Sequence, residues 1–586
     1  MIGRRELLGI GSAALASCNR SDGAYFGSTV PPRTAKLVHS LPGEPDTLDP
    51  AKSSGGYEFY VIPAMFEGLT QYHPRLPEPM AALATHYEAS PEQDQFTFYL
   101  RGHTAPRGIR LPNAENLPVE FTRGRKATPG AIPARWSDGT AITAEDFVYS
   151  WQRFLAPETA APMAYQLYCV KNAEDINTGK RSPRELPVRA VDEFTFQVDL
   201  ISPTPFFLQL ITVYWFSAVP RQAIEAARQR GNESSWTEPK HMVVCGPFGL
   251  REWRRYESIT VIRNPLYYEA SMVGLEELRF MPVSDETTAV NLYRSGAVAT
   301  MPGFSFPPLF TTALGRKKDF HAEPCFGTAA ATISAKRPPF DNFLLRYALN
   351  MATEKGSITA LLGGGRIPAL NVVPPVPGYV RPANLEVMVD GRRRDVLAFN
   401  IEGARALLMK AGFDPIIGRG KRRLELTHHI AALSDYKLRG EMLQEQWHRN
   451  LGIRVNLAVH EFSLHWKMVL EGDYSGVADY SFLMTYFDPN PYLDPFSTRD
   501  VGNPTGWTDP VYASMLADAN RSLDSHERMA KLANCEKLLL QAMPLIPLYF
   551  ETLTYLQKPF VRGLTSNPFD IRAFKYVWID KSWRST

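Results

Sequence analysis

The chain has 586 residues, of which 44% are hydrophobic, 21% charged and 11% aromatic, a globular profile that excludes a disordered chain, a coiled coil and a collagen-like fibre. Lys and Arg outnumber Asp and Glu by only 64 to 61, so the overall charge gives no reason to expect a nucleic-acid partner. The 47 prolines predict many loop connections and disfavour a helix bundle or a membrane carrier.

The first 17 residues are typical of a secretory signal peptide. Arg4 and Arg5 precede an apolar run from Leu7 to Ala16, which is too short to cross a bilayer but suits the hydrophobic region of a signal. The run ends in the sequence LASC, which resembles a bacterial lipobox with Cys18 as the lipidated residue. A plain signal peptide with a chance Cys is the alternative, and both the Sec and the twin-arginine export routes stay open. We therefore expect the mature protein in the periplasm or cell envelope, tethered to the membrane through Cys18.

Two irregular segments follow. Residues 18–35 contain several Gly, Ser and Pro and predict a flexible tether. Residues 102–135 contain five prolines and a majority of basic over acidic side chains, which predicts a long irregular basic loop. A loop of this length is either functional or loosely ordered.

Helical and extended patterns alternate along the rest of the chain. A capping-box sequence from Thr143 to Asp146 opens a helix whose apolar residues fall on one face. A second helix is predicted to end at Gly452, with an alternating strand over 453–459 after it. A third helical stripe ends at Pro544 and precedes a short buried strand. Repeated alternation of helix and strand predicts α/β lobes.

The sequence shows no signature of a catalytic site, neither a Walker loop nor a G-x-S-x-G motif. His460 and His465 resemble the zinc-protease helix, but five residues on a helix would leave them about 140° apart. His428 and His429 are adjacent in a predicted strand, so their rings face opposite sides. We therefore expect no catalytic residue, no cofactor and no metal site, and a protein that binds rather than transforms its ligand. Four cysteines show no metal-ligand spacing, and their state stays open between disulfides and free thiols: Cys169, Cys245, Cys325 and Cys535.

A series of short motifs, in one order, closely resembles the oligopeptide-binding proteins of peptide ABC transporters, solute-binding family 5. The resemblance extends from about residue 37 to the C-terminus. Single motifs are weak, but a dozen in register are specific. Those that carry it include TLDP at 47–50, MFEGLT at 65–70, WSDGT at 136–140, TAEDFVYSWQR at 143–153, NLYRSG at 291–296, KRPPFD at 336–341 and PLIPLY at 544–549.

The resemblance implies an α/β protein with a two-lobed, type II periplasmic-binding-protein-like fold, a hinged cleft between the lobes and an additional α/β domain. It implies a monomer that captures an oligopeptide or peptide-like ligand, delivers it to ABC transporter permease subunits and binds no nucleic acid. The implied divisions are lobe I at 36–60, 201–323 and 556–586, the accessory domain at 61–200, and lobe II at 324–555.

The implied ligand site departs from the family pattern at several positions. Peptide binders of the family place an Asp before a Tyr to meet the ligand's ammonium group, whereas here Thr485 stands before Tyr486. Phe462 and Phe482 stand where pocket tryptophans are found, and Asp479 stands where an Arg can occur.

A displaced carboxylate could replace the missing one. Glu44, which aligns with a ligand-facing acidic residue, Asp479 or Asp488 could meet a buried ammonium, which is costly without a counter-charge. The alternatives are a ligand without a free α-amine, such as a blocked peptide or a glycan, and a sensory receptor. A secreted hydrolase is the remaining alternative, and no motif supports it. The expected ligand-binding residues are Glu44, Phe462, Asp479, Phe482, Thr485, Tyr486 and Asp488.

Overall fold

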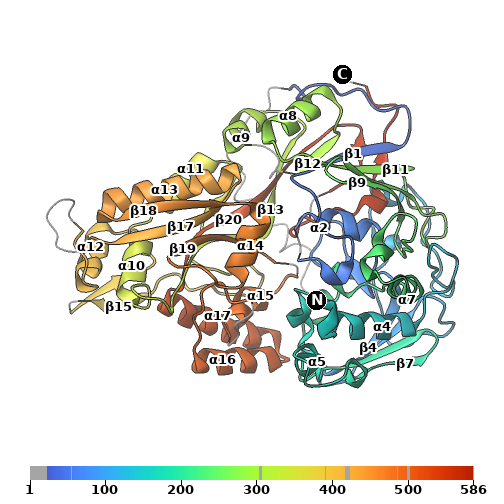
Figure 1. Cartoon of the computed structure of the whole chain (residues 1–586), viewed down its shortest axis with the longest axis horizontal. Coiled ribbons are helices and arrows are strands. Elements are labelled where there is room, and N and C mark those ends of the chain that lie inside the picture. Colours follow the sequence, from blue (N-terminus) through green and yellow to red (C-terminus); the bar gives the residue numbers. More distant parts are fainter. Residues whose placement is uncertain are drawn as a thin grey trace. The chain divides into compact units, whose positions relative to one another are not determined.

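Two compact units make up the protein (Figure 1). The computed structural model describes residues 23–54, 56–302, 307–389, 391–415, 423–484, 486–497, 502–565 and 567–584. Apart from the N-terminal residues outside that description, unit 1 comprises Pro307–Arg316 and Ala322–Leu553. Unit 2 comprises Asp22–Phe306, Lys317–His321 and Thr554–Thr586. The division of unit 2 into a lobe and an accessory domain stays a prediction.

Unit 1 is built on a mixed sheet. Its strands in spatial order are β18 (Arg454–His460), β17 (Glu425–Ala431), β19 (Val477–Leu483), β13 (Phe320–Ile333) and β20 (Leu545–Gln557). β17 runs parallel to β18 and β19, β13 runs antiparallel to β19, and the short β14 (Ile367–Pro368) pairs with β20. β19 is buried on both faces except at its last residue, which is typical of a central strand.

Helices and a small hairpin complete unit 1. The hairpin is formed by β15 (Glu386–Val389) and β16 (Arg392–Asp395), and α16 packs against α17. The helices are α9 (Pro308–Leu314), α10 (Phe343–Met351), α11 (Lys355–Leu362), α12 (Ile401–Lys410), α13 (Ser434–Leu451), α14 (Phe462–Leu470), α15 (Asn490–Leu493), α16 (Pro510–Arg521) and α17 (Ser525–Ala542).

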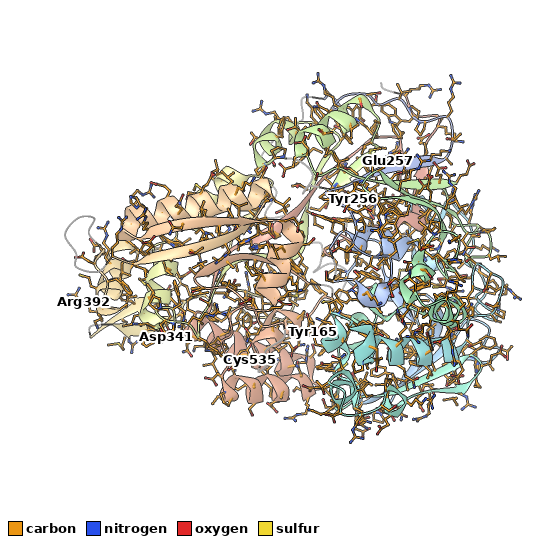
Figure 2. All side chains as sticks on the ribbon, in the orientation of Figure 1. Tyr165, Tyr256, Glu257, Asp341, Arg392 and Cys535 are labelled. Atoms are coloured by element: carbon orange, nitrogen blue, oxygen red, sulfur yellow. The ribbon has the colours of Figure 1, made fainter. Side chains whose placement is uncertain are left out.

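The helices and strands predicted in the C-terminal half are confirmed. α13 ends at Gly452, which takes the left-handed conformation with φ of 66°, and β18 follows directly. α17 and β20 lie where the third stripe and the buried strand were predicted. Cys535 lies on the buried face of α17 (Figure 2).

Unit 2 contains two larger sheets. The first runs β12 (Thr300–Pro302), β1 (Lys36–Leu41), β11 (Glu277–Pro282), β10 (Ser258–Arg263) and β9 (Phe248–Arg254), with the end of β20 beside β12. The second is the antiparallel sheet β6 (Ile109–Arg110), β4 (Ala84–Ala89), β5 (Gln95–Leu100), β8 (Thr195–Asp199) and β7 (Val188–Asp192). The second sheet draws only on the span for which the sequence predicts an accessory domain.

The remaining elements of unit 2 are short helices and two small hairpins. α4 packs against β7 and β8, and the backbone N–H of Thr143 donates to Asp146 at 2.8 Å, which confirms the predicted capping box. The helices are α2 (Glu58–Val61), α3 (Val119–Thr122), α4 (Ala144–Leu155), α5 (Ala173–Asn177), α6 (Phe207–Leu210), α7 (Arg221–Gln229) and α8 (Glu286–Ser295). The hairpins are β2 (Thr70–Tyr72) with β3 (Pro79–Ala81), and β21 (Val561–Arg562) with β22 (Trp578–Ile579).

The described part of the predicted tether is packed against unit 2, where a flexible segment was expected. The backbone N–H of Phe26 donates to Asp319 at 2.9 Å, and the Lys558 ammonium donates to the carbonyl of Phe26 at 2.8 Å. The Phe26 ring stacks on Tyr293, and the backbone N–H of Ser28 donates to the carbonyl of Arg294. The prediction of a flexible tether relied on the Gly, Ser and Pro content and did not consider Phe26, whose ring anchors the segment on Tyr293.

Segment 102–135 is irregular, as predicted, but it is anchored to unit 2. Phe121 on α3 is fully buried against Met80, Leu117 and Tyr576. The Arg123 guanidinium donates to the carbonyl of Met272 at 2.7 Å. The loosely ordered alternative is therefore wrong for the centre of this segment.

Among the residues that the structure describes, the four cysteines form no disulfide with one another, which answers the question of their pairing. None of the helices in the described residues is both long and apolar enough to cross a membrane. Residues 1–17 and Cys18, with the predicted signal peptide and lipid attachment, lie outside the described residues.

Candidate functional site

A row of aromatic rings in unit 1 contains two of the predicted ligand residues. Phe462, the first residue of α14, is partly exposed and stacks on Trp466 at 6.4 Å between ring centroids. Trp466 stacks in turn on Tyr480 at 5.0 Å, and Tyr480 meets Phe482 edge-on at 4.5 Å. Phe482 is 1% exposed, so it supports the row from the core, whereas Phe462 and Trp466 present partly exposed surfaces. Sequence reasoning missed Trp466, although it lies one helical turn after Phe462.

Asp479 forms an ion pair in the interior of unit 1. One carboxylate oxygen lies 2.8 Å from His428 Nε2, and the other accepts from Arg439 Nε at 2.9 Å. All three side chains are at most 1% exposed, and Arg439 also donates to the Tyr549 hydroxyl. Burial opposes the charged form of Asp479, but Arg439 and His428 outweigh it and hold the pKa of this carboxyl below its ordinary value. Its role toward a ligand stays a prediction, and its present partners are internal.

Asp488 is likewise committed to a cation of its own unit. Arg528 on α17 donates to its two oxygens at 2.6 and 2.9 Å, and the backbone N–H of Asn490 donates to one of them at 2.8 Å. The side chains of Asp488 and Arg528 are only 7% and 4% exposed. A ligand ammonium would have to compete with this bidentate pair, so Asp488 is a poor replacement for the missing carboxylate. The sequence could not predict the pairing of Arg528 with Asp488, because the two residues are 40 positions apart in the chain.

Glu44 stabilises a hairpin of unit 2. Its carboxylate accepts from Trp253 Nε1 at 2.7 Å and from the backbone N–H of Tyr256 at 3.1 Å. The Arg255 guanidinium lies 3.8 Å away and stacks over the Trp253 ring. Tyr256 itself is 82% exposed at the turn between β9 and β10 (Figure 2). Glu44 therefore has a local structural role, and ligand binding by it stays a prediction.

The last two predicted residues are adjacent in sequence. Tyr486 is buried, its hydroxyl lies 3.3 Å from the Asn490 amide that donates to it, and burial raises the pKa of this phenol well above its ordinary value. Thr485 lies outside the described residues.

A second charged group of unit 1, which we call the Arg366 cluster, was not predicted. It consists of Arg366, Asp435, Glu551 and Ser481. The Arg366 guanidinium pairs with Asp435 and lies 3.5 Å from Glu551, and the Ser481 hydroxyl donates to Glu551 at 3.0 Å. Two carboxylates therefore share one guanidinium, which leaves an excess of negative charge.

The Arg366 cluster borders the aromatic row. Tyr436, next to Asp435 on α13, meets the Phe462 ring edge-on at 6.4 Å. Ser481 lies between Tyr480 and Phe482 on β19, so its side chain points to the opposite face of that strand from their rings. The side chains of Arg366, Glu551 and Asp435 are 8%, 11% and 24% exposed. Three elements, α13, β19 and β20, and the loop before β14 bring these residues together, so no local sequence motif predicts them.

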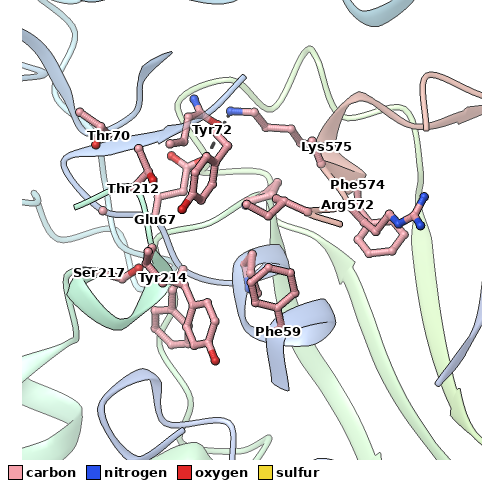
Figure 3. A pocket seen from close by; sticks show the side chains of 18 residues that line it. Phe59, Glu67, Thr70, Tyr72, Thr212, Tyr214, Ser217, Arg572, Phe574 and Lys575 are labelled. Carbon is pink, nitrogen blue, oxygen red and sulfur yellow. Dashed lines mark hydrogen bonds and ion pairs between the residues drawn. The ribbon is translucent and has the colours of Figure 1, made fainter. Parts of the chain in front are cut away.

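Unit 2 contains a small cavity of about 70 Å³ (Figure 3). Tyr72 and Thr212 line it, together with Glu67 and Lys575, whose charged groups are 3.3 Å apart. This volume is far below the roughly 300–1,000 Å³ of ligand pockets, so the cavity suits water molecules and not a peptide. No residue of the predicted ligand site lines it.

The histidine pairs do not form a metal centre within the described residues. His428 is buried against Asp479, while His429 lies on the other side of β17 and contacts His460 at 3.0 Å. The opposite orientation predicted for the adjacent histidines is confirmed. His465 contacts the carbonyl of Asp479 and is buried, and burial lowers the pKa of its imidazole to about 4.

Comparison with known proteins places the chain among solute-binding proteins. Residues 133–503 match the model of the bacterial extracellular solute-binding proteins, family 5 middle region. The periplasmic murein peptide-binding protein MppA of Escherichia coli is 28% identical over 565 residues, 94% of this chain and 95% of that protein. The solved MppA structure superposes with a TM-score of 0.79 over 94% of this chain and 99% of the other, at 27% identity.

Two further relatives differ in ligand. OppA of Haemophilus influenzae, solved in complex with the peptide RPPGFSPFR, is 25% identical with a TM-score of 0.79, over 94% of this chain and 100% of that one. The probable deoxycholate-binding periplasmic protein YgiS of Escherichia coli is 28% identical over 547 residues, 92% of each chain. The structural likeness over almost the whole of both chains confirms the predicted α/β fold class.

Proposed function

Because the chain belongs to family 5 of the bacterial extracellular solute-binding proteins, we propose that it captures oligopeptides or peptide-like solutes outside the cytoplasm. It would deliver them to the permease subunits of an ABC transporter. The family consists of binding proteins and not enzymes, and its fold is the multi-domain periplasmic-binding-protein fold. The observation that carries the proposal is the match to peptide-binding relatives over nearly the full length of both chains.

We assign recognition of the ligand in unit 1 to the aromatic row and the Arg366 cluster. Phe462 and Trp466 have partly exposed rings, which suit apolar side chains of a ligand. The excess carboxylate of the Arg366 cluster suits a cationic group, whether an α-ammonium or a basic side chain. Both proposals rest on residues that lie within a single unit.

A non-peptide solute, or a peptide without a free α-amine, is the second candidate. Each of the three carboxylates expected to replace the family's Asp accepts hydrogen bonds from groups of its own unit: Glu44, Asp479 and Asp488. The relative YgiS supports this candidate, because its ligand is named as deoxycholate.

The membrane anchor is part of the proposal. We propose that Cys18 is lipidated after export and that the mature protein is tethered in the cell envelope. Mass spectrometry of the mature N-terminus would detect a diacylated Cys18. A mature chain that begins elsewhere, without lipid, would contradict it.

Native mass spectrometry of the gently purified protein tests the proposed ligand. We expect a co-purified peptide or peptide-like molecule that is released on unfolding, and saturable quenching of tryptophan fluorescence when it is added back. A bound steroid or glycan would favour the second candidate. Conversion of the added molecule into product would contradict the binding function.

A further inference from the structure

Segment 102–135, which we call the basic segment, accounts for the net positive charge of the whole chain. It carries six Arg or Lys residues against two Glu, a net charge of +4, whereas the full chain has a net charge of +3. The other 552 residues together are therefore slightly acidic. The basic segment also lies before the stretch that matches the family model, apart from its last three residues.

The acidic residues of the basic segment are already neutralised. Arg110 donates to Glu115 at 3.1 Å, and Arg75 pairs with Glu120. By contrast, three exposed cations have no carboxylate within ion-pair distance among the residues that the structure describes: Arg107, Arg125 and Lys126. Arg123 is near Arg125 and Arg263, and burial together with these two cations lowers the pKa of its guanidinium. The segment thus presents uncompensated positive charge to solvent.

Exposed apolar side chains accompany these cations. Ile109 is 59% exposed, Val119 is 71% exposed and Ile132 is 50% exposed. Isolated exposed apolar residues are ordinary on protein surfaces, but three β-branched residues in one basic segment are the composition of a membrane-surface contact. A soluble polyanion would use the cations and leave the apolar side chains in water.

The two ends of the segment are held together on a rigid base. The backbone N–H of Leu111 donates to the carbonyl of Thr85 on β4, and Gly130 lies against the Thr85 side chain. Gly102 donates to the carbonyl of Gly130 at 2.8 Å, and the Arg101 guanidinium donates to the carbonyl of Thr128 at 3.3 Å. Ile109 lies on β6, which pairs with β4, and Ile132 follows two residues after Gly130, so both lie in stretches of backbone that approach β4. Arg107 is two residues from Ile109 in the chain.

We propose that the basic segment docks unit 2 on an anionic lipid surface. Arg107, Arg125 and Lys126 would pair with the phosphates of lipid headgroups, and Ile109 and Ile132 would enter the interface between headgroups and acyl chains. No described helix spans a membrane, so this contact would be peripheral and reversible. The inference is independent of the ligand that the protein captures.

Vesicle co-sedimentation of the full chain tests the proposal. A Cys18→Ser background removes any attached lipid, and the probes are vesicles of phosphatidylcholine alone or with about 30% phosphatidylglycerol. We expect binding to the anionic vesicles to be at least about tenfold tighter, and to weaken about tenfold when salt rises from about 50 to 300 mM. Equal binding to both vesicles would overturn the proposal.

Two triple variants distinguish the effect of the basic segment from the effect of the protein's overall charge. Arg107→Glu, Arg125→Glu and Lys126→Glu together should abolish the preference for anionic vesicles. The matched control reverses three exposed cations elsewhere in unit 2 and should retain most of the binding: Lys171→Glu, Arg184→Glu and Arg230→Glu. Equal losses in the two triple variants would overturn the proposal. The midpoint of thermal unfolding should be the same in the two triple variants, because every changed side chain is exposed.

Ile109→Ser with Ile132→Ser tests the apolar contact. We expect about a tenfold loss of vesicle affinity that persists at high salt, and an unchanged affinity would overturn insertion of these side chains. A charge-reversal variant that binds vesicles normally but no longer delivers ligand to the permease would assign the segment to a protein partner instead. That outcome would also overturn the proposal.

Discussion

The two units each bury a cluster of charged side chains, and the clusters differ in balance. In unit 2, Glu67 and Glu269 face Lys575 and Arg101, and all four side chains are at most 6% exposed. In unit 1, the Arg366 cluster sets two carboxylates against one guanidinium, with Asp435 24% exposed. A balanced, sealed cluster stabilises the fold, whereas an unbalanced, partly open one has charge left for a ligand.

Hydrogen bonds reinforce the difference. Glu67 accepts from the Tyr267 and Tyr268 hydroxyls at 2.5 and 2.7 Å in addition to the Lys575 ammonium. Glu551 has Ser481 as its hydroxyl donor. The unit 2 cluster also adjoins the cavity of Figure 3, which is too small for a peptide. Burial and charge alone therefore do not mark a ligand site, and the balance of charge is the better guide.

The largest effect is expected from breaking the balanced cluster. Lys575→Met removes the ammonium that pairs with both Glu67 and Glu269 and leaves Arg101, which lies 3.9 Å from Glu269. The change should lower the free energy of unfolding of unit 2 by about 3–5 kcal/mol. Denaturant titration measures this loss. The exposed Lys581→Met is the control and should change stability by less than about 0.5 kcal/mol. A small loss in Lys575→Met would contradict the structural role given to this cluster.

Asp479→Asn should cause the next largest loss of stability, because it leaves Arg439 buried without its carboxylate partner. We expect a loss of about 3 kcal/mol for unit 1 at neutral pH. The pKa of Asp479 is lowered on folding, so its stabilisation is present above the ordinary carboxyl pKa and is lost as pH falls through the folded value. The variant should therefore converge on the wild type in acid. Unchanged stability with weakened ligand binding would instead favour a direct ligand contact.

Glu536, a buried carboxyl whose partners among the described residues are hydrogen-bond donors and not an ion pair, should show the opposite pH dependence. Glu536 is 0% exposed and accepts from the backbone N–H groups of Val372 and Val373 and from the Tyr379 hydroxyl, and burial raises its pKa to about 7. Its folded pKa lies above its unfolded one, so its stabilisation is complete below about pH 4.5 and disappears as pH rises to about 7.

Glu536→Gln should remove this dependence. Between about pH 4.5 and 7 the wild type should lose about 3 kcal/mol relative to the variant. Denaturant titrations of both proteins at pH 5, 6 and 7 measure the difference. Parallel curves across this range would show that Glu536 titrates normally.

The smallest change in stability is expected at the unbalanced cluster. Asp435→Asn should alter the free energy of unfolding by less than about 1 kcal/mol, because the side chain is partly exposed and Glu551 still faces Arg366. Affinity for a ligand with a free ammonium should fall about tenfold. Titration calorimetry with trialanine and with N-acetylated trialanine measures the affinity, and denaturant titration measures the free energy of unfolding. A loss that is equal for the two peptides would separate Asp435 from the ammonium, and the exposed Glu471→Gln is the control.

The sequence was sufficient for the elements and the fold class. The capping box at Thr143, the stop at Gly452 and the stripe of α17 were visible because they are local patterns. The pairings of the charged side chains could not be predicted from the sequence. Asp488 meets Arg528 across 40 residues, and the Arg366 cluster assembles from three elements and a loop, so only the folded chain brings them together.

The docked residues 24–28 limit how far the protein can stand from a membrane. If Cys18 carries lipid, only residues 19–23 separate the anchor from Ala24, whose carbonyl accepts from the backbone N–H of Lys318. Fully extended, that stretch reaches about 20 Å. A linker this short would keep the residues around Asp319 and Tyr293 within about 20 Å of the lipid anchor.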